Sequence, residues 1–102
     1  MKLFIQIPCY NEEDNLLKTL NDLPSKIDGI DEIEILIIDD GSTDNTLQIA
    51  KNSKAHHVLS LGSNRGLATA FRKGVDFALS HGADILVNTD ADNQYCANDI
   101  SK

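Results

Sequence analysis

The sequence predicts an α/β fold in which a mostly parallel β-sheet lies between layers of helices. Short apolar segments begin near residues 3, 33, 57 and 85, and the intervals between them have the residue spacing of helices. Strands and helices that alternate in this way form parallel sheets with right-handed crossovers. We therefore expect three layers built from Rossmann-like βα repeats, in a chain whose 102 residues allow one domain, or part of one, with a single core.

The first strand is expected at residues 3–7, Leu-Phe-Ile-Gln-Ile. A helix should follow, with Asn11 as its N-cap and carboxylates at 12–14 in its first turn, where the helix dipole favours negative charge. Pro24 marks its end. The apolar face of this helix is expected to hold four leucines, Leu16, Leu17, Leu20 and Leu23.

Residues 33–38, Ile-Glu-Ile-Leu-Ile-Ile, give the strongest strand signal in the chain. Their nearly continuous apolar character predicts a central strand that is covered on both faces. A second helix is expected from a cap at Ser42 or Thr43 through about Lys51. A weaker strand is expected at 57–61.

The third helix is expected to open at Gly66 and to be followed by Gly82 at the C′ position. Its apolar stripe comprises Leu67, Phe71, Val75, Ala78 and Leu79. Gly74 lies on this stripe, which predicts that a strand packs closely against the helix there. The fourth strand is expected at 85–87, Ile-Leu-Val.

The residues with distinctive chemistry follow the expected strands. They occupy four segments, 8–12, 39–42, 63–66 and 90–95, whereas the helix-to-strand returns are ordinary turns such as 27–29. In an open parallel sheet, ligands bind outside the carboxyl ends of the strands. The four segments therefore predict one binding site at that edge of the sheet.

Asp90, Asp92 and Gln94 alternate along the last of these segments, so an extended backbone would point their side chains the same way. Two carboxylates and an amide oxygen form a ligand set suited to Mg²⁺ or Mn²⁺. Such a metal would let an acidic edge hold an anionic diphosphate, with Arg65 or a helix N-terminus assisting. The alternative is that the Asp-x-Asp pair caps the next helix and binds no ion.

The charge balance limits the class of partner. Nine Lys and Arg residues against sixteen Asp and Glu residues give a net charge of −7. Because affinity for nucleic acid rests mostly on Lys and Arg side chains that neutralise phosphates, this balance argues against a nucleic-acid partner.

The segment 39–42, Asp-Asp-Gly-Ser, can recognise a base. One of its carboxylates could accept the imide N–H of uracil or guanine, which cytosine and adenine lack. Tyr10 could stack on the base or ribose, and Glu12 could reach the nucleotide. The alternative is that these residues form only a turn and helix caps.

Histidines and cysteines are expected to have no catalytic role. His56, His57 and His81 should lie at the opposite edge of the sheet as surface or capping residues. Cys9 and Cys96 flank the binding edge, but no His follows there to form a thiolate pair, so both thiols are expected to be unreactive. Their spacing matches no zinc or redox motif, which favours a cytosolic chain with reduced thiols.

Four stretches of the sequence resemble the motifs of the family 2 glycosyltransferases. They are residues 7–13, 38–44, 64–66 together with Gly74, and 90–95. Their order and spacing are similar to those of the nucleotide-binding, N-terminal half of the GT-A fold. The Asp-Ala-Asp-x-Gln form looks most like the branch that makes polyprenyl-phosphate sugars, including the dolichyl-phosphate mannose synthases.

The resemblance implies a nucleoside pocket lined by four residues, Pro8, Tyr10, Glu12 and Asp40. It implies that the Asp-x-Asp-x-Gln side chains hold a metal that bridges the diphosphate of a UDP- or GDP-sugar and stabilises the leaving nucleoside diphosphate. The implied reaction is inverting transfer of the sugar, in a single displacement, to a polyprenyl phosphate or a growing glycan. The implied location is the cytoplasm, at the cytoplasmic face of a membrane if the full-length protein is membrane-attached.

By the same resemblance, residues 1–102 are expected to be the nucleotide-sugar-binding part of a longer catalytic domain, truncated after the Asp-x-Asp motif. The catalytic base would lie downstream, so we expect this chain alone to be inactive, with an uncovered strand edge that favours self-association. Two alternatives stay open. One is a truncated, non-catalytic nucleotide-binding module, and the other is a receiver-like phospho-acceptor domain, which would need a Lys after the last strand.

Overall fold

The computed structural model of the protein describes residues 1–89. Its elements follow one another as β1 (Lys2–Cys9), α1 (Leu16–Asn21), β2 (Glu32–Asp39), α2 (Thr46–Lys51), β3 (His57–Ser60), α3 (Leu67–Ser80) and β4 (Ile85–Asn88). The predicted alternation of strands and helices is confirmed, and each strand contains or closely matches its predicted segment. Within the described part of the chain, no helix is both long enough and apolar enough to cross a membrane.

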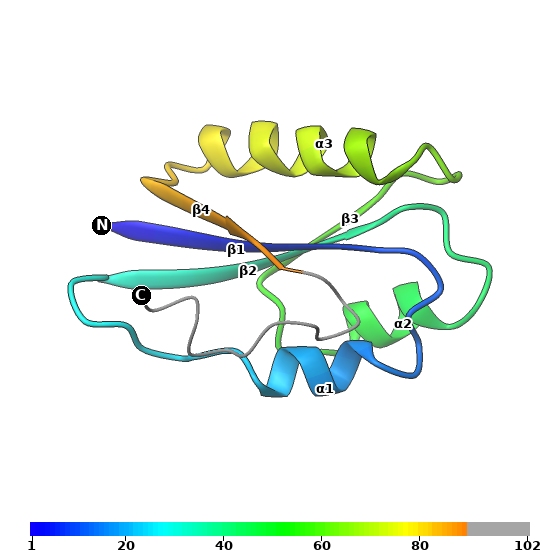
Figure 1. The fold of residues 1–102 in the computed structure, drawn as a ribbon, viewed down its shortest axis with the longest axis horizontal. Helices are drawn as coiled ribbons and strands as arrows, with labels where there is room; N and C mark the ends of the chain where they lie inside the picture. Colours follow the sequence, from blue (N-terminus) through cyan, green and yellow to red (C-terminus); the bar gives the residue numbers. More distant parts are fainter. Residues whose placement is uncertain (90–102) are drawn as a thin grey trace.

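The strands form one parallel sheet in the order β3-β2-β1-β4. Helix α3 covers one face of the sheet, and α1 and α2 cover the other (Figure 1). The predicted three-layer α/β class is therefore confirmed. This arrangement brings the carboxyl ends of β1, β2 and β3 to the same edge of the molecule.

Alternate side chains of the central strands enter two separate cores. Ile5 and Ile7 of β1 pack in the core on the side of α1 and α2, whereas Phe4 packs with Ala70 and Ala78 of α3. Strand β2 divides its side chains in the same way, and the residues from Ile35 to Asp39 are all buried. The prediction that 33–38 form a central strand covered on both faces is confirmed.

The first two helices begin later than the sequence predicts. Helix α1 starts at Leu16 rather than after Asn11, and α2 starts at Thr46 rather than after Ser42 or Thr43. Asn11 caps no helix, because its backbone has a φ of 53° and its side chain bonds to a neighbouring loop instead. Leu17 is 50% exposed, so the apolar face of α1 is narrower than predicted.

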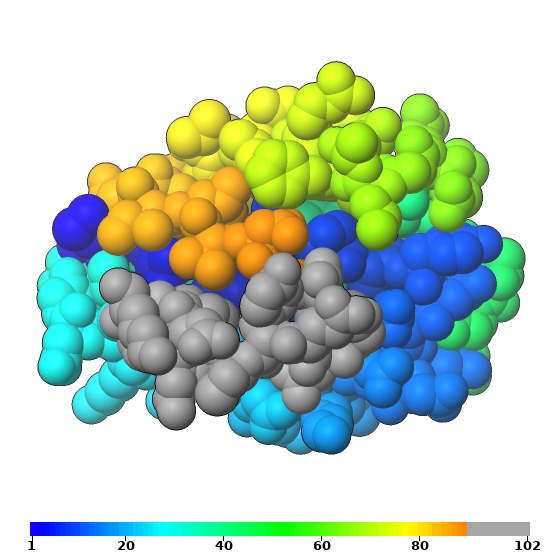
Figure 2. Space-filling model, in the orientation of Figure 1, coloured from blue at the N-terminus to red at the C-terminus, as the bar shows by residue number. Residues whose placement is uncertain are grey.

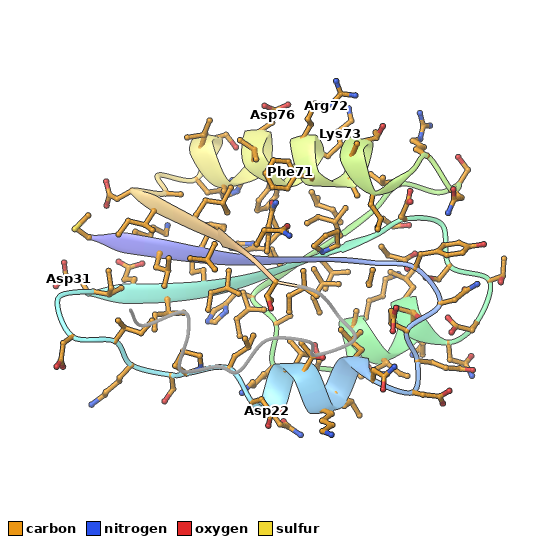
Figure 3. All side chains as sticks on the ribbon, viewed as in Figure 1. Asp22, Asp31, Phe71, Arg72, Lys73 and Asp76 are labelled. Atoms are coloured by element: carbon orange, nitrogen blue, oxygen red, sulfur yellow. The ribbon has the colours of Figure 1, made fainter. Side chains whose placement is uncertain are left out.

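Helix α3 turns a different face to the sheet than its large apolar residues predict. The buried residues are Ala70, Gly74 and Ala78, whereas Leu67, Phe71 and Leu79 are exposed. Small side chains occupy these positions because they allow the axis of α3 to lie close to the sheet. Figure 3 shows Phe71 on the flank of α3 and Arg72 pointing away from the sheet.

The close contact predicted at Gly74 is confirmed. A Cβ atom on this residue would lie 2.0 Å from Oε1 of Gln6, a fully buried side chain of β1. Gly82 follows the end of α3 with a φ of 82°, as its predicted C′ position requires.

The histidines lie away from the carboxyl edge, as predicted. His56 and His57 are at the start of β3, and His81 follows the end of α3. His57 is more than a surface residue, because its Nε2 lies 2.6 Å from Glu34 and its ring stacks on Phe4. These contacts give it a structural role at the amino edge of the sheet.

Candidate functional site

The loops that follow β1, β2 and β3 meet at the carboxyl edge of the sheet, at the right of Figure 1. The parallel register sets Cys9 beside Asp39, and the N–H of Asp40 donates to the Cys9 carbonyl at 2.9 Å. The chain leaves the sheet at neighbouring points, so short side chains in one loop can reach the backbone of the next.

The β1–α1 loop is joined to the β2–α2 loop through Asn11. Its Oδ1 accepts hydrogen bonds from the N–H groups of Thr43 at 2.8 Å and Asp44 at 3.3 Å. In return, the Asn11 N–H donates to the Ser42 hydroxyl at 2.9 Å. The side chain predicted to cap a helix therefore joins two loops instead.

Further bonds tie the same two loops together. The N–H of Glu12 donates to the Thr46 hydroxyl at 2.8 Å, and the N–H of Asn45 donates to the Glu13 carboxylate at 3.1 Å. Asp44 accepts from both the hydroxyl and the N–H of Thr46. Partial desolvation would raise the pKa of the Asp44 carboxyl, but these hydrogen bonds outweigh it and hold the pKa below its usual value.

Asp40 joins the β2–α2 loop to the β3–α3 loop. Its carboxylate is 1% exposed and accepts from the N–H groups of Arg65 at 2.7 Å and Gly66 at 3.0 Å. The next residue, Gly41, has a φ of 73°, and a Cβ there would lie 2.2 Å from the backbone carbon of Ser63. The two loops are therefore in backbone contact, and only glycine fits at this point.

Asp39 points to the opposite side of the sheet from Asp40. Its Oδ2 accepts from the Ser42 N–H at 3.3 Å, while its buried Oδ1 has no hydrogen-bond partner among the described residues. Burial, reinforced by the nearby Asp39 carboxylate, raises the pKa of the Cys9 thiol to about 12. This thiol stays protonated at neutral pH, in line with the prediction that it is unreactive.

The residues predicted to bind nucleotide all lie at this edge. Pro8 is buried beside Ile38 at the end of β1, and Tyr10 follows it with 39% of its surface exposed. Glu12 is half-buried, and the Arg65 side chain is exposed while its N–H is bonded to Asp40. The structure brings these residues and Asp40 to one rim, and their contact with a nucleotide stays a prediction.

The contacts between loops are what sequence reasoning missed. Asn11 was expected only to cap a helix, and no role was predicted for Asp44 or Thr46. The signal available was the concentration of short polar side chains at 11 and 42–46, since such side chains bond readily to nearby backbone. Which backbone they reach depends on the strand order, which the pattern does not give.

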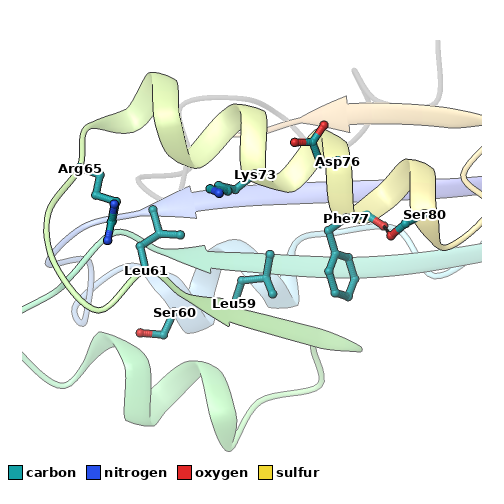
Figure 4. Close-up of a pocket in the computed structure, with 8 residues that line it drawn as sticks. All are labelled: Leu59, Ser60, Leu61, Arg65, Lys73, Asp76, Phe77 and Ser80. Carbon is teal, nitrogen blue, oxygen red and sulfur yellow. Dashed lines mark hydrogen bonds between the residues drawn. The ribbon is translucent and has the colours of Figure 1, made fainter.

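A groove of about 530 Å³ runs between α3 and β3 on the same face of the sheet as Asp40. Leu59, Leu61 and Phe77 line it together with Arg65 and Lys73. Figure 4 shows Arg65 near the loop that joins β3 to α3 and Phe77 toward the other end. Arg65 therefore borders both this groove and the rim formed by the three loops.

The predicted metal ligands Asp90, Asp92 and Gln94 lie outside the described residues, as does Cys96. Within residues 1–89, no group of three or more His, Cys, Asp or Glu side chains is arranged to hold a metal ion. The oxygen-only donor set of the Asp-x-Asp-x-Gln segment suits Mg²⁺ or Mn²⁺, and its binding of a metal stays a prediction.

Comparison with known proteins identifies the family. The sequence model described as glycosyl transferase family 2 matches residues 4–102, nearly the whole chain. The chain belongs to glycosyltransferase family 2. The resemblance of the four motifs is thereby confirmed at the level of the family.

Several relatives of this family 2 chain act on lipid phosphates, as their names state. The undecaprenyl-phosphate mannosyltransferase of Micrococcus luteus is 35% identical over 93% of this chain and 40% of its own length. The UDP-N-acetylglucosamine–dolichyl-phosphate N-acetylglucosaminyltransferase of Methanococcus voltae is 33% identical over 98% of this chain and 45% of its own length. The chain thus spans less than half the length of these relatives.

Solved structures show the same fold. S. aureus TarS, residues 1–349, matches 90% of the family 2 chain and 28% of its own length, with a TM-score of 0.69 and 29% sequence identity. The structure of this TarS fragment in complex with UDP matches with the same TM-score, 0.69. The GT-A type of fold expected from the sequence is therefore confirmed.

Proposed function

We propose that this chain forms the donor-binding part of a glycosyltransferase that uses a UDP-sugar. The observation that carries the proposal is the rim at the carboxyl edge, where three loops are held together by Asn11, Thr46 and Asp40. A rim fixed before the ligand arrives loses little conformational entropy on binding. The proposal is supported by the likeness to TarS, which was solved with UDP.

The rim is acidic, so a diphosphate needs a cation. Besides burial, the carboxylates of Asp39, Glu12, Asp44 and Asp40 all raise the pKa of the Cys9 thiol, so negative charge surrounds the end of β1. We propose that Asp90, Asp92 and Gln94 hold Mg²⁺ or Mn²⁺ beside them. When bound, the metal would supply positive charge that offsets the diphosphate and stabilises the departing nucleoside diphosphate.

The proposed acceptor is a polyprenyl phosphate. The support is the printed names of the relatives in Micrococcus luteus and Methanococcus voltae. A growing glycan is the second acceptor class, because a poly-β-1,6-N-acetyl-D-glucosamine synthase of Staphylococcus epidermidis is 34% identical over 83% of this chain. A lipid-phosphate acceptor would place the full-length protein at the cytoplasmic face of a membrane.

The nucleotide and metal proposals share one experiment. UDP, GDP and CDP are titrated into the protein by calorimetry, each with and without Mn²⁺. We expect UDP to bind best and Mn²⁺ to tighten its binding by about tenfold or more. Asp92→Asn should remove that gain, and the control Asp28→Asn, an exposed carboxyl at the opposite edge, should keep it.

Each result has a distinct meaning. Failure of all three nucleotides to bind would contradict donor binding. Equal UDP affinity with and without the cation would contradict the metal proposal alone. Tighter binding of GDP than of UDP would support the nucleotide site but show that it recognises guanine rather than uracil.

A further inference from the structure

We infer that Asn11 is a positioning residue for the nucleotide site, holding Tyr10 and Glu12 in place through the β2–α2 loop. The inference rests on the proposed function, because Tyr10 and Glu12 are the residues expected to face the nucleoside. Asn11 lies between them in the chain, so its conformation sets the direction in which both leave the loop.

The Asn11 backbone has an unusual conformation. Its φ of 53° is the only positive value at a non-glycine residue among residues 1–89. Asn, Asp and Gly tolerate this left-handed region far better than other residues. The turn at Asn11 directs the chain away from β1, and the following N–H, that of Glu12, donates to the Thr46 hydroxyl at 2.8 Å.

The Asn11 side chain forms further contacts with the β2–α2 loop. Its Oδ1 lies 2.8 Å from the Thr43 nitrogen, 3.3 Å from the Thr43 hydroxyl and 3.3 Å from the Asp44 nitrogen. These donors belong to the loop that also contains Asp40 and Gly41. The amide oxygen therefore ties the position of Tyr10 and Glu12 to that of Asp40.

Two requirements meet at position 11. The backbone needs a residue that tolerates positive φ, and the neighbouring loop needs an acceptor. Glycine meets only the first requirement. Aspartate meets both but adds a negative charge beside Glu12, Glu13 and Asp44, where a diphosphate would also be repelled. Asparagine alone supplies the conformation and a neutral acceptor.

The test compares Asn11→Gly with Asn11→Asp. We expect Asn11→Gly to bind UDP about tenfold more weakly than wild type, or about 1.4 kcal/mol. With uridine, which has no phosphate to be repelled, Asn11→Asp should stay within about twofold of wild type, because it keeps both the acceptor and the backbone conformation. If Asn11→Asp keeps the wild-type affinity for uridine and Asn11→Gly does not, the side-chain acceptor is the group that positions the loop.

A matched control separates positioning from general stability. Gly29 has a φ of 85° with no atom within 4 Å of an added Cβ, and it lies in the return to β2 at the amino edge. Gly29→Ala should therefore lower the urea midpoint through backbone strain while leaving the UDP affinity unchanged.

The outcomes are separable from those of the proposed function. Wild type that binds neither UDP nor uridine contradicts donor binding itself. Wild type that binds UDP, with Asn11→Gly binding equally well, overturns the positioning role. Loss of uridine binding in Asn11→Asp to the same extent as in Asn11→Gly also overturns it.

Discussion

Asp39 and Asp40 are neighbours in the chain, yet their side chains lie on opposite sides of the sheet and have different hydrogen-bond donors. The alternation of side chains along β2 continues to the residue after it, so Asp40 lies on the α3 side and accepts two backbone N–H groups, while Asp39 lies on the α2 side and accepts one. A carboxylate oxygen has more than one lone pair, so Asp40 can hold the Arg65–Gly66 turn and still accept a base N–H. Under the proposed function, Asp40 would both hold this turn and accept a hydrogen bond from the base.

Removing the Asp40 carboxylate should weaken and broaden nucleotide binding. In Asp40→Ala, the imide N–H of uracil loses its acceptor and the N–H groups of Arg65 and Gly66 lose theirs. We expect a loss of about 1–3 kcal/mol in UDP binding and less discrimination against CDP and ADP. Calorimetric titration of the three nucleotides measures both effects. Full selectivity in the variant would place base recognition elsewhere, such as the backbone near Pro8.

The lowered pKa of Asp44 predicts a pH dependence of stability. Its ordinary pKa is 3.8 and the folded value is lower, so the contribution of its ionised form is present above about pH 4 and is lost as the pH falls through the folded pKa. Asp44→Asn should cost about 1 kcal/mol at pH 7, because the group is half-exposed, and less at pH 3, where part of the contribution of the ionised form is lost. Urea unfolding of wild type, Asp44→Asn and the control Asp28→Asn at both pH values measures this. A cost that is equal at pH 7 and pH 3 would contradict the assignment.

At the scale of elements, the packing of α3 depends on the absence of a side chain at position 74. Gln6 lies beneath the helix, where its Nε2 donates to Asn88 of β4 at 3.0 Å and its Oε1 points toward Gly74. Gln6 Oε1 has no hydrogen-bond partner among the described residues, and it lies 2.0 Å from the position that a Cβ on residue 74 would take. The helix and both strands thus share one buried polar contact.

Gly74→Ala should destabilise the fold despite the better helix propensity of alanine. Alanine gains at most about 1 kcal/mol in a helix, whereas overpacking a fitted core costs about 1–3 kcal/mol and displacing Gln6 breaks its bond to Asn88. We expect a net loss of about 1–2 kcal/mol in the free energy of unfolding. In a Gln6→Ala background the same substitution should cost little, as a double-mutant cycle in urea would show. An equal cost in both backgrounds would place the clash at Ile38 instead, whose Cδ1 lies 2.9 Å from the added Cβ.

At the scale of the whole molecule, the net charge and the exposed apolar surface have opposite effects on self-association. The chain carries a net charge of −7, which keeps copies apart. However, α3 and β4 lie together on one face (Figure 2), and β4 is an edge strand of the described sheet. These two elements carry four large exposed apolar side chains, Leu67, Phe71, Leu79 and Ile85.

We expect this surface to favour self-association of the 102-residue chain, because an unpaired edge beside apolar side chains can pair with another copy. Light scattering should give a mass above 11.2 kDa, rising with salt as charge repulsion is screened. Phe71→Asp should reduce the mass. Leu17→Asp, at a comparably exposed leucine on α1 across the sheet, should not. A monomer of 11.2 kDa at all salt concentrations would contradict this prediction.

The sequence by itself determined the class of the fold, the edge of the sheet at which the distinctive residues gather, and the family. Short apolar runs at regular intervals specify parallel strands, and the position of unusual residues after each strand specifies the carboxyl edge. The four motifs, at 7–13, 38–44, 64–66 with Gly74, and 90–95, indicated the family because their order and spacing are similar to those of its members. These features are local, so the order of residues along the chain encodes them directly.

Only the tertiary structure decided how the loops contact one another and which face of α3 is buried. Asn11 looked like a helix cap, because the pattern does not show that residues 43 and 44 lie beside it. Leu67 and Phe71 were predicted on the buried stripe but are exposed, whereas Ala70, which was not predicted there, is buried. At Gly74, which the prediction did place on the stripe, Gln6 and Ile38 leave no room for a larger side chain. Contacts of this kind depend on the strand order β3-β2-β1-β4, which juxtaposes residues tens of positions apart, and no local pattern carries that order.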